Sequence, residues 1–327
     1  MSRLDTPFTR DAGVSVPVIC GPMYPCSNPE LVAAVSQAGG LGVLQPVSLT
    51  YVFGFEFREG VQRIRELTDR PIGMNCLIEA SSQRYLERME RWLDIALEEG
   101  VRFFVTSLGK PDWVVQRVHA VGGHVYHDVT ERKWAQKAVD GGVDGLIAVN
   151  RRAGGHPGPL DPAALLDAVG DLGLPVVAAG GVATPDQVSE MLALGYAGVQ
   201  MGTRFIATPE CAASEDYKQA IVEADADDIV WTERITGVPV AVLDTPFVRA
   251  VGTRAGPLAR LLLRGRKTRH WMRSWYALRS LARLKRSSIG RGRDDYWQAG
   301  RSVDGIDALL PAGEVVRRCA ERLDGPA

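Results

Sequence analysis

Short apolar runs without polar interruptions recur along the first two-thirds of the chain. Their starts lie roughly 20–30 residues apart. The absence of alternation predicts strands that are covered on both faces, as in a parallel sheet. The eight predicted strands span 16–20, 41–44, 71–76, 101–106, 124–127, 145–149, 175–179 and 198–201.

Most gaps between these runs carry a stretch with helical periodicity. Examples are 29–38, 83–99, 111–121, 132–140, 162–169 and 185–194. Glycine follows several of them, as in SQAGGLGVL and LALGYAGVQM, where a left-handed residue ends a helix just before the next strand. Eight strand–helix repeats predict an α/β fold, a (β/α)8 TIM barrel, with an open doubly wound sheet as the alternative.

The repeat breaks near residue 207. Residues 207–240 resemble a helix followed by an extended segment, and the rest of the chain is helical and unlike the repeats. We therefore expect a barrel over 10–206. We also expect a lid or cap with a basic helical extension, packed on the barrel, over 207–327.

Composition narrows the class of protein further. Apolar residues make up 46% and charged residues 24%, which excludes wholesale disorder, collagen and coiled coil. The 38 basic and 39 acidic residues nearly cancel, which argues against a nucleic-acid-binding protein. Five cysteines without a CxxC pair indicate neither a disulfide framework nor a zinc site, and they suggest the cytoplasm. No signal peptide or membrane span is expected.

In parallel barrels the chemistry sits at the carboxyl ends of the strands. Paired glycines, Gly180 and Gly181, follow the seventh run, and Gln200-Met201-Gly202-Thr203 ends the eighth. Small residues let backbone N–H groups approach an anion, so these neighbouring loops predict a site for a phosphate-bearing cofactor. The alternative is that the glycines serve only the turns.

The sixth run is followed by Ala-Gly-Gly-His-Pro-Gly at 153–158. Gly154 leaves room for a flat ligand, and His156 projects an imidazole that can act as acid or base near neutral pH. We expect His156 to be catalytic, although a loop histidine can also merely cap a turn.

Further polar residues end the third, fourth and fifth runs. These are Asn75-Cys76, Thr106-Ser107 and His127-Asp128, which together could hydrogen-bond the rim of a heteroaromatic ring. His127 could equally be a satisfied interior histidine, and Cys76 is better explained as a packed residue. Met23, after the first run, either lies against a ring face or fills the core.

Together these motifs resemble the nitronate monooxygenase family, FMN-dependent TIM barrels that also include flavin-dependent enoyl-ACP reductases. The resemblance covers about 10–240, with an echo at 296–300. It rests on Gly-Pro-Met at 21–23, Ala-Gly-Gly-Leu-Gly at 38–42, Met-Asn at 74–75, the loop at 153–158, Ala-Gly-Gly-Val at 179–182 and Gln-Met-Gly-Thr-Arg-Phe at 200–205.

The resemblance implies that His156 is the catalytic imidazole and that FMN is the cofactor. The expected FMN contacts are Met23, Asn75, Gly154, Gly180, Gly181, Gln200, Met201, Gly202 and Thr203. No metal is implied. The chain departs from the family pattern at Val149, where Gln is common, and at Arg152, where Glu is common. A cation at position 152 favours an anionic substrate, and it disfavours protonation of His156. The alternative is that Arg152 is only a solvated loop arginine.

A second unusual feature is the basic segment between Arg254 and Arg293, which contains no Asp or Glu. Trp271, Trp275 and Tyr276 are interleaved at near-helical spacing and predict an amphipathic helix. It could pack on the acidic body of its own or a neighbouring subunit, receive acyl-CoA or a carrier protein, or face a membrane or nucleic acid. We favour the first.

The resemblance leads to a main functional hypothesis, an FMN-dependent oxidoreductase that oxidises alkyl nitronates with O2. The alternative is an enoyl-thioester reductase that uses NAD(P)H, and a third possibility is a flavin-binding protein without turnover. A small-molecule substrate, a possible homo-oligomer and no nucleic-acid partner complete the expectation.

Overall fold

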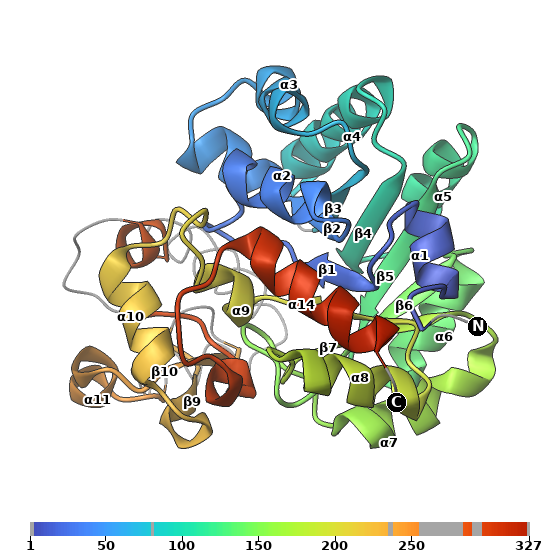
Figure 1. Cartoon of the computed structure of the whole chain (residues 1–327). Coiled ribbons are helices and arrows are strands. Elements are labelled where there is room, and N and C mark those ends of the chain that lie inside the picture. The colour runs from blue at the N-terminus through green and yellow to red at the C-terminus, as the bar shows by residue number, and fades with distance from the viewer. Residues whose placement is uncertain (1–2, 80–81, 235–237, 255–283, 290–295, 326–327) are drawn as a thin grey trace.

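The computed structural model describes residues 3–79, 82–234, 238–254, 284–289 and 296–325. Eight parallel strands close into a barrel, which confirms the predicted TIM barrel over the open sheet (Figure 1). Closure occurs between the first and last strands, where Ile19 aligns with Gln200. The strands are β1 (Val18–Cys20), β2 (Leu41–Leu44), β3 (Ile72–Ile78), β4 (Phe103–Leu108), β5 (His124–Val129), β6 (Gly145–Val149), β7 (Val176–Ala179) and β8 (Gly198–Met201).

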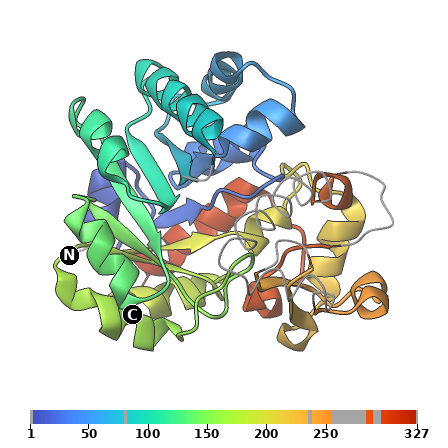
Figure 2. The same ribbon diagram turned by 180° about the vertical axis from the view of Figure 1, so that it is seen from behind.

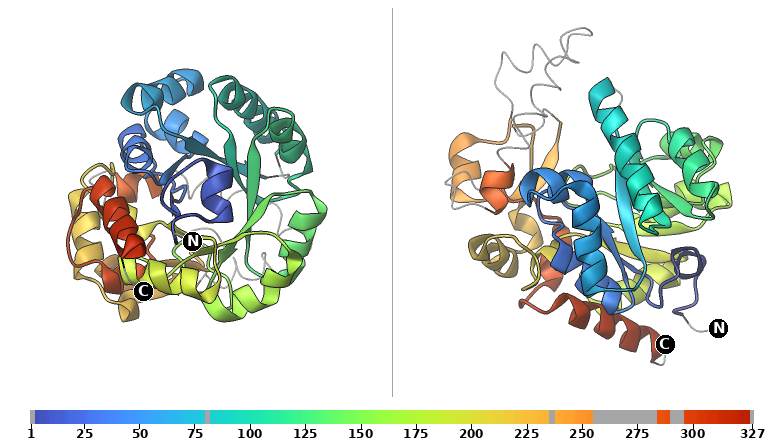
Figure 3. Two further views of the ribbon diagram at one scale, coloured as in Figure 1. Left: turned by 45° about the vertical axis from the view of Figure 1, so that its right-hand side comes forward. Right: turned by 90° about the horizontal axis from the view of Figure 1, so that it is seen from above.

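Helices connect successive strands and surround the barrel (Figure 3, left). They are α2 (Pro29–Gln37), α3 (Phe57–Leu67), α4 (Gln83–Glu98), α5 (Asp112–His119), α6 (Arg132–Asp140), α7 (Pro162–Val169) with the 3-10 turn η2 (Gly170–Leu172), and α8 (Pro185–Leu194). The connection between β2 and β3 also holds a π-helical turn, η1 (Ser48–Val52). The six predicted helices are present, and α3 is an addition to them.

Alternation along the strands separates two apolar layers. Ile19, Val105 and Tyr126 point into the barrel and form one buried cluster. Phe8 of α1 (Pro7–Ala12) joins this cluster and is fully buried. Helix α1 thus covers one end of the barrel. The opposite end, where the strands have their carboxyl termini, is the one that ligands can reach.

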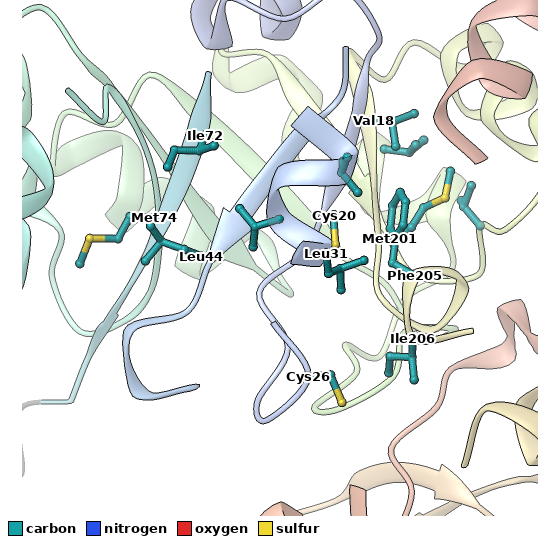
Figure 4. Packing of buried hydrophobic residues seen from close by; sticks show 14 of the residues in the cluster. Val18, Cys20, Cys26, Leu31, Leu44, Ile72, Met74, Met201, Phe205 and Ile206 are labelled. Atoms are coloured by element: carbon teal, nitrogen blue, oxygen red, sulfur yellow. The ribbon is translucent and has the colours of Figure 1, made fainter. Parts of the chain in front are cut away.

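The other layer lies between the strands and the helices. Val18, Met74 and Met201 point outward into it, where Leu31 of α2 also packs (Figure 4). This layer holds most of the buried apolar side chains, and it fixes the strand ends relative to the helices.

Apart from its final helix, the chain after β8 forms a separate group of elements beside the barrel (Figures 1 and 2). A helix followed by extended chain is present, as the sequence predicted. The elements are α9 (Thr203–Ile206), α10 (Glu215–Glu223), η3 (Ala226–Asp228), the antiparallel pair β9 (Ile229–Thr232) and β10 (Val240–Leu243), α11 (Pro246–Val251), η4 (Arg301–Gly305) and α14 (Ala312–Asp324). In the described ranges no helix has the length and apolar character to cross a membrane.

The final helix, α14, returns to the barrel and packs against both α2 and α8 (Figure 1). Its residues Val315, Val316 and Cys319 are buried there. Because α9 after β8 has only four residues, α14 takes the place in the ring that the last barrel helix would occupy. Most of the predicted basic helix, 255–283 and 290–293, lies outside the described residues.

Candidate active site

Three polar side chains point into the barrel from strands that are far apart in sequence. Asn75 on β3, Asp128 on β5 and Gln200 on β8 alternate with the outward-facing apolar residues of their strands. Each has one side-chain oxygen that is enclosed and has no hydrogen-bond partner in the part of the chain the structure describes. Buried polar atoms in folded proteins are normally paired, so these three groups are candidates to bind a polar ligand.

The same alternation removes other expected residues from the site. Thr106 and His127 point toward the helix layer, where Thr106 Oγ1 lies 2.8 Å from His127 Nδ1. Burial lowers the pKa of His127 to about 4, so the imidazole is neutral at pH 7. Cys76 is fully buried, and burial raises the pKa of its thiol. The expectation that Thr106 and His127 line the barrel mouth is therefore wrong. The alternative for His127, an interior histidine, and the expectation that Cys76 is a packed residue are confirmed.

The side chain of Met201 also faces the helix layer and is buried (Figure 4). Only its backbone can meet a ligand at the mouth. Met23 lies on the other side of this strand end, and a Cβ added to Gly202 would be 3.5 Å from the sulfur of Met23. The loops after β1 and β8 therefore approach each other at Met23 and Gly202.

Glycine is required at both positions after β7 because the neighbouring β6 loop leaves no room for a side chain. This steric requirement is independent of the predicted role in binding an anion. Gly180 and Gly181 both have positive φ, 110° and 77°. A Cβ on Gly180 would be 2.6 Å from the backbone nitrogen of Ala153, and one on Gly181 would be 2.8 Å from the Cβ of Arg152. The β7 loop thus packs closely under the β6 loop, which brings the predicted phosphate loop next to the loop of His156.

His156 lies on the loop that follows β6. Its side chain is exposed to solvent, yet the surrounding protein lowers its pKa by desolvation. The loop is held from the cap side, where the Ala241 N–H of β10 donates to the Gly155 carbonyl at 2.8 Å. A lowered pKa keeps the imidazole neutral at pH 7, the form that accepts a proton.

The segment 296–300, detected in the sequence only as a weak echo, is a structural part of the site. The Gly300 N–H donates to Thr203 Oγ1 at 3.0 Å, and the Arg301 N–H donates to the Arg152 carbonyl at 2.9 Å. This segment joins the β8 loop to the β6 loop. The hydroxyl of Thr203 is therefore already engaged by protein. The signal that could have identified the segment is the Ala-Gly pair that follows two aromatic residues.

The two departures from the family pattern lie on opposite sides of the β6 strand end. Val149 points into the barrel next to its apolar core. Arg152 is exposed and its Nε lies 3.8 Å from Asp161 Oδ1, a carboxylate that also pairs with Arg151 at 3.0 Å. Because one carboxylate serves two guanidinium groups, a net positive charge remains beside Gly181.

The closed parallel barrel and the loops that meet at its carboxyl end define a TIM-barrel protein with a candidate ligand site at that end. The chain belongs to the nitronate monooxygenase family, a family of flavoenzymes whose model matches residues 6–318. The match therefore extends past β10 and into α14.

Similar proteins agree with this assignment. The chain is 28% identical to the nitronate monooxygenase of Pseudomonas aeruginosa, over 97% of this chain and 99% of the relative. It is 31% identical to a Mycobacterium tuberculosis protein named (3aS,4S,5R,7aS)-5-hydroxy-7a-methyl-1-oxo-octahydro-1H-indene-4-carboxyl-CoA dehydrogenase, over 96% of this chain and 86% of the relative. The structure of FabK from Thermotoga maritima superposes with a TM-score of 0.80 at 26% identity, covering 98% and 96% of the two chains. These findings confirm the predicted family, the barrel and an oxidoreductase of nitronate monooxygenase type.

Proposed function

We propose that the protein is an FMN-dependent enzyme that oxidises alkyl nitronates at the barrel mouth. The observation that carries the proposal is a set of inward-pointing polar groups whose enclosed oxygens have no hydrogen-bond partner among the described residues, namely Asn75, Asp128 and Gln200. A flavin ring has a pyrimidine edge with both N–H and carbonyl groups. Amide side chains can pair with either kind of group, so Asn75 and Gln200 fit such an edge.

The glycine loops suit the phosphate end of the same cofactor. Gly154, Gly180, Gly181 and Gly202, with the backbone of Met201 and Thr203, lie along the β6, β7 and β8 ends where barrels commonly bind phosphate. Met23 lies beside Gly202 and would contact the flavin ring. When bound, FMN would accept an electron pair from the substrate and pass it to O2.

His156 supplies the acid–base chemistry in this proposal. For a neutral nitroalkane it takes the α-proton, which leaves the electron pair on the substrate carbon for oxidation. For a preformed nitronate no proton has to be removed. The positive charge of Arg152 beside the loop favours the anionic substrate, because opposite charges at short range attract.

The test is anaerobic reduction of purified, flavin-loaded protein. We expect propyl-2-nitronate to bleach the flavin absorbance within a single turnover, and NADH and NADPH to leave it unchanged. Bleaching by NADPH but not by nitronate would support the reductase alternative. No bleaching by either would support a flavin-binding protein without turnover.

A second candidate substrate is a CoA thioester, because the M. tuberculosis relative that matches along 96% of this chain is named as a carboxyl-CoA dehydrogenase. A thioester, like a nitroalkane, has an acidic α-C–H bond. His156 could therefore take the α-proton in either reaction while the cofactor takes the electrons. Anaerobic bleaching of the oxidised flavin by a saturated acyl-CoA tests oxidation. Re-oxidation of flavin that has first been reduced with dithionite, by an α,β-unsaturated acyl-CoA, tests reduction.

Three further expectations belong to the proposal. The five cysteines are all buried and unpaired, in keeping with a cytoplasmic location. The division into a barrel over 10–206 and an extension over 207–327 remains our description of the domains. A homo-oligomer remains a prediction that a sedimentation measurement would test.

A further inference from the structure

Asp128 is a chemical group at the barrel mouth that the proposed reaction does not use. It lies two residues beyond Tyr126, which points into the barrel core, while Val125 and Val129 point outward. Asp128 therefore faces the barrel interior at the carboxyl end of β5. The residue keeps partial exposure, but its Oδ1 is enclosed and has no hydrogen-bond partner within the described chain.

The surroundings of Asp128 favour its neutral form. Burial raises its pKa to about 7, and no neighbouring charge in the described residues contributes to the shift. A carboxylate without a nearby cation is unfavourable in a low-dielectric site, so burial shifts Asp128 toward its protonated form. A flat ligand over the mouth would remove the remaining water and favour the neutral acid further. A neutral carboxyl has an O–H donor to offer, which a carboxylate lacks.

We propose that Asp128 contacts the flavin ring as a neutral carboxylic acid and donates a hydrogen bond to a ring carbonyl oxygen. This inference rests on the proposed function. The depth of the residues assigns the contact to the cofactor rather than to the substrate. Asp128 belongs to the inner surface of the barrel, whereas His156 is exposed on the loop above it. A substrate within reach of His156 would approach from the solvent side, whereas a cofactor ring seated in the barrel mouth would meet Asp128 on the inner surface.

The experiment measures flavin binding without turnover. Apoprotein is titrated with FMN and, separately, with riboflavin, and binding is followed by the quenching of flavin fluorescence. The variants are Asp128→Ala, Asp128→Asn and a matched control, Asp140→Ala, whose side chain is exposed on α6. Riboflavin lacks the phosphate, so a contact to the ring must affect both ligands equally.

We expect Asp128→Ala to raise the dissociation constants of FMN and riboflavin by about tenfold, the effect of losing one net hydrogen bond. Asp128→Asn should stay within about threefold of the parent, because an amide N–H replaces the O–H donor. Asp140→Ala should bind as the parent does. The melting temperature of Asp128→Ala apoprotein should be no lower than that of the parent, because the enclosed Oδ1 has no hydrogen-bond partner among the described residues. This measurement also verifies folding.

Several results would overturn the inference. If Asp128→Ala binds both flavins as the parent does, Asp128 does not contact the flavin ring. If flavin binding is unchanged but the KM for the substrate rises, Asp128 contacts the substrate instead. A loss in Asp128→Asn as large as in Asp128→Ala shows that a negative carboxylate is needed. If the parent protein binds neither flavin, the proposed function fails as well, which separates that outcome from the others.

Discussion

Gly300 provides the sharpest test of how the C-terminal segment supports the site. Its φ is −105°, which any residue can adopt, so the need for glycine is purely steric. A Cβ at this position would lie 2.5 Å from the backbone nitrogen of Gly154 and 2.7 Å from the carbonyl oxygen of Arg152. These are backbone atoms next to His156, so they cannot move aside by rotating a side chain.

Gly300→Ala should therefore push the segment 296–300 away from the β6 loop. Forcing one extra methyl group into a packed site costs about 1–3 kcal/mol. With an unfolding entropy of about 2.1 cal/mol/K per residue and 327 residues, the melting temperature should fall by about 1.5–4 °C. Because the β6 loop carries His156, we expect a loss in kcat of about tenfold, since small displacements of catalytic groups are costly.

The matched control is Gly170→Ala. Gly170 has a φ of −67°, and an added Cβ would meet nothing closer than 3.7 Å. This change should leave the melting temperature unchanged or raise it slightly, because alanine restricts the unfolded chain more than glycine does. Differential scanning calorimetry and steady-state kinetics measure both effects. If Gly300→Ala melts and turns over like Gly170→Ala, the proposed support of the β6 loop is refuted.

Three other predictions follow from the site. His156→Asn should keep its flavin but turn over neutral nitroalkanes roughly 10²-fold more slowly. The loss with preformed nitronates should be much smaller. Equal rates for the variant and the parent would show that His156 takes no part in the reaction. Gly181→Asp should abolish FMN binding but spare riboflavin, because the new carboxylate meets the phosphate; equilibrium dialysis measures this, and full FMN retention would show that the phosphate binds elsewhere. His127 has a folded pKa of about 4, below its unfolded value near 6.5. Its contribution to stability is therefore complete above pH 6.5 and is lost as the pH falls toward 4, by up to about 3 kcal/mol. Urea unfolding of His127→Gln should show a shallower loss across that window, and an unchanged pH profile would contradict the burial argument.

The local pattern of apolar residues and glycines was sufficient to predict the barrel and the loops that carry its candidate site. Uninterrupted apolar runs require cover on both faces, and eight of them with intervening helices close a barrel. Because the carboxyl ends of parallel strands share one edge, the loops at 153–158, 179–182 and 200–205 could be assigned to one site from their order alone. The family resemblance then named the chemistry, which the comparisons confirm.

Which polar side chains enter the site depends on the phase of each strand, and an unbroken apolar run does not reveal that phase. A shift of one residue exchanges the inner and outer faces, so His127 and Asp128 could not be distinguished in the sequence. Packing against α1 and the helix ring places Tyr126 and Asp128 inside and His127 outside.

The long-range contacts were equally beyond reach of the sequence. Gly300 meets Gly154 across nearly half the chain, and α14 packs against α2. The sequence alone thus determined the barrel and the order of its loops, because both follow from local periodicity and glycine placement. Only the tertiary structure decided the strand phase and the C-terminal closure, because both depend on which surfaces pack together after the chain has folded.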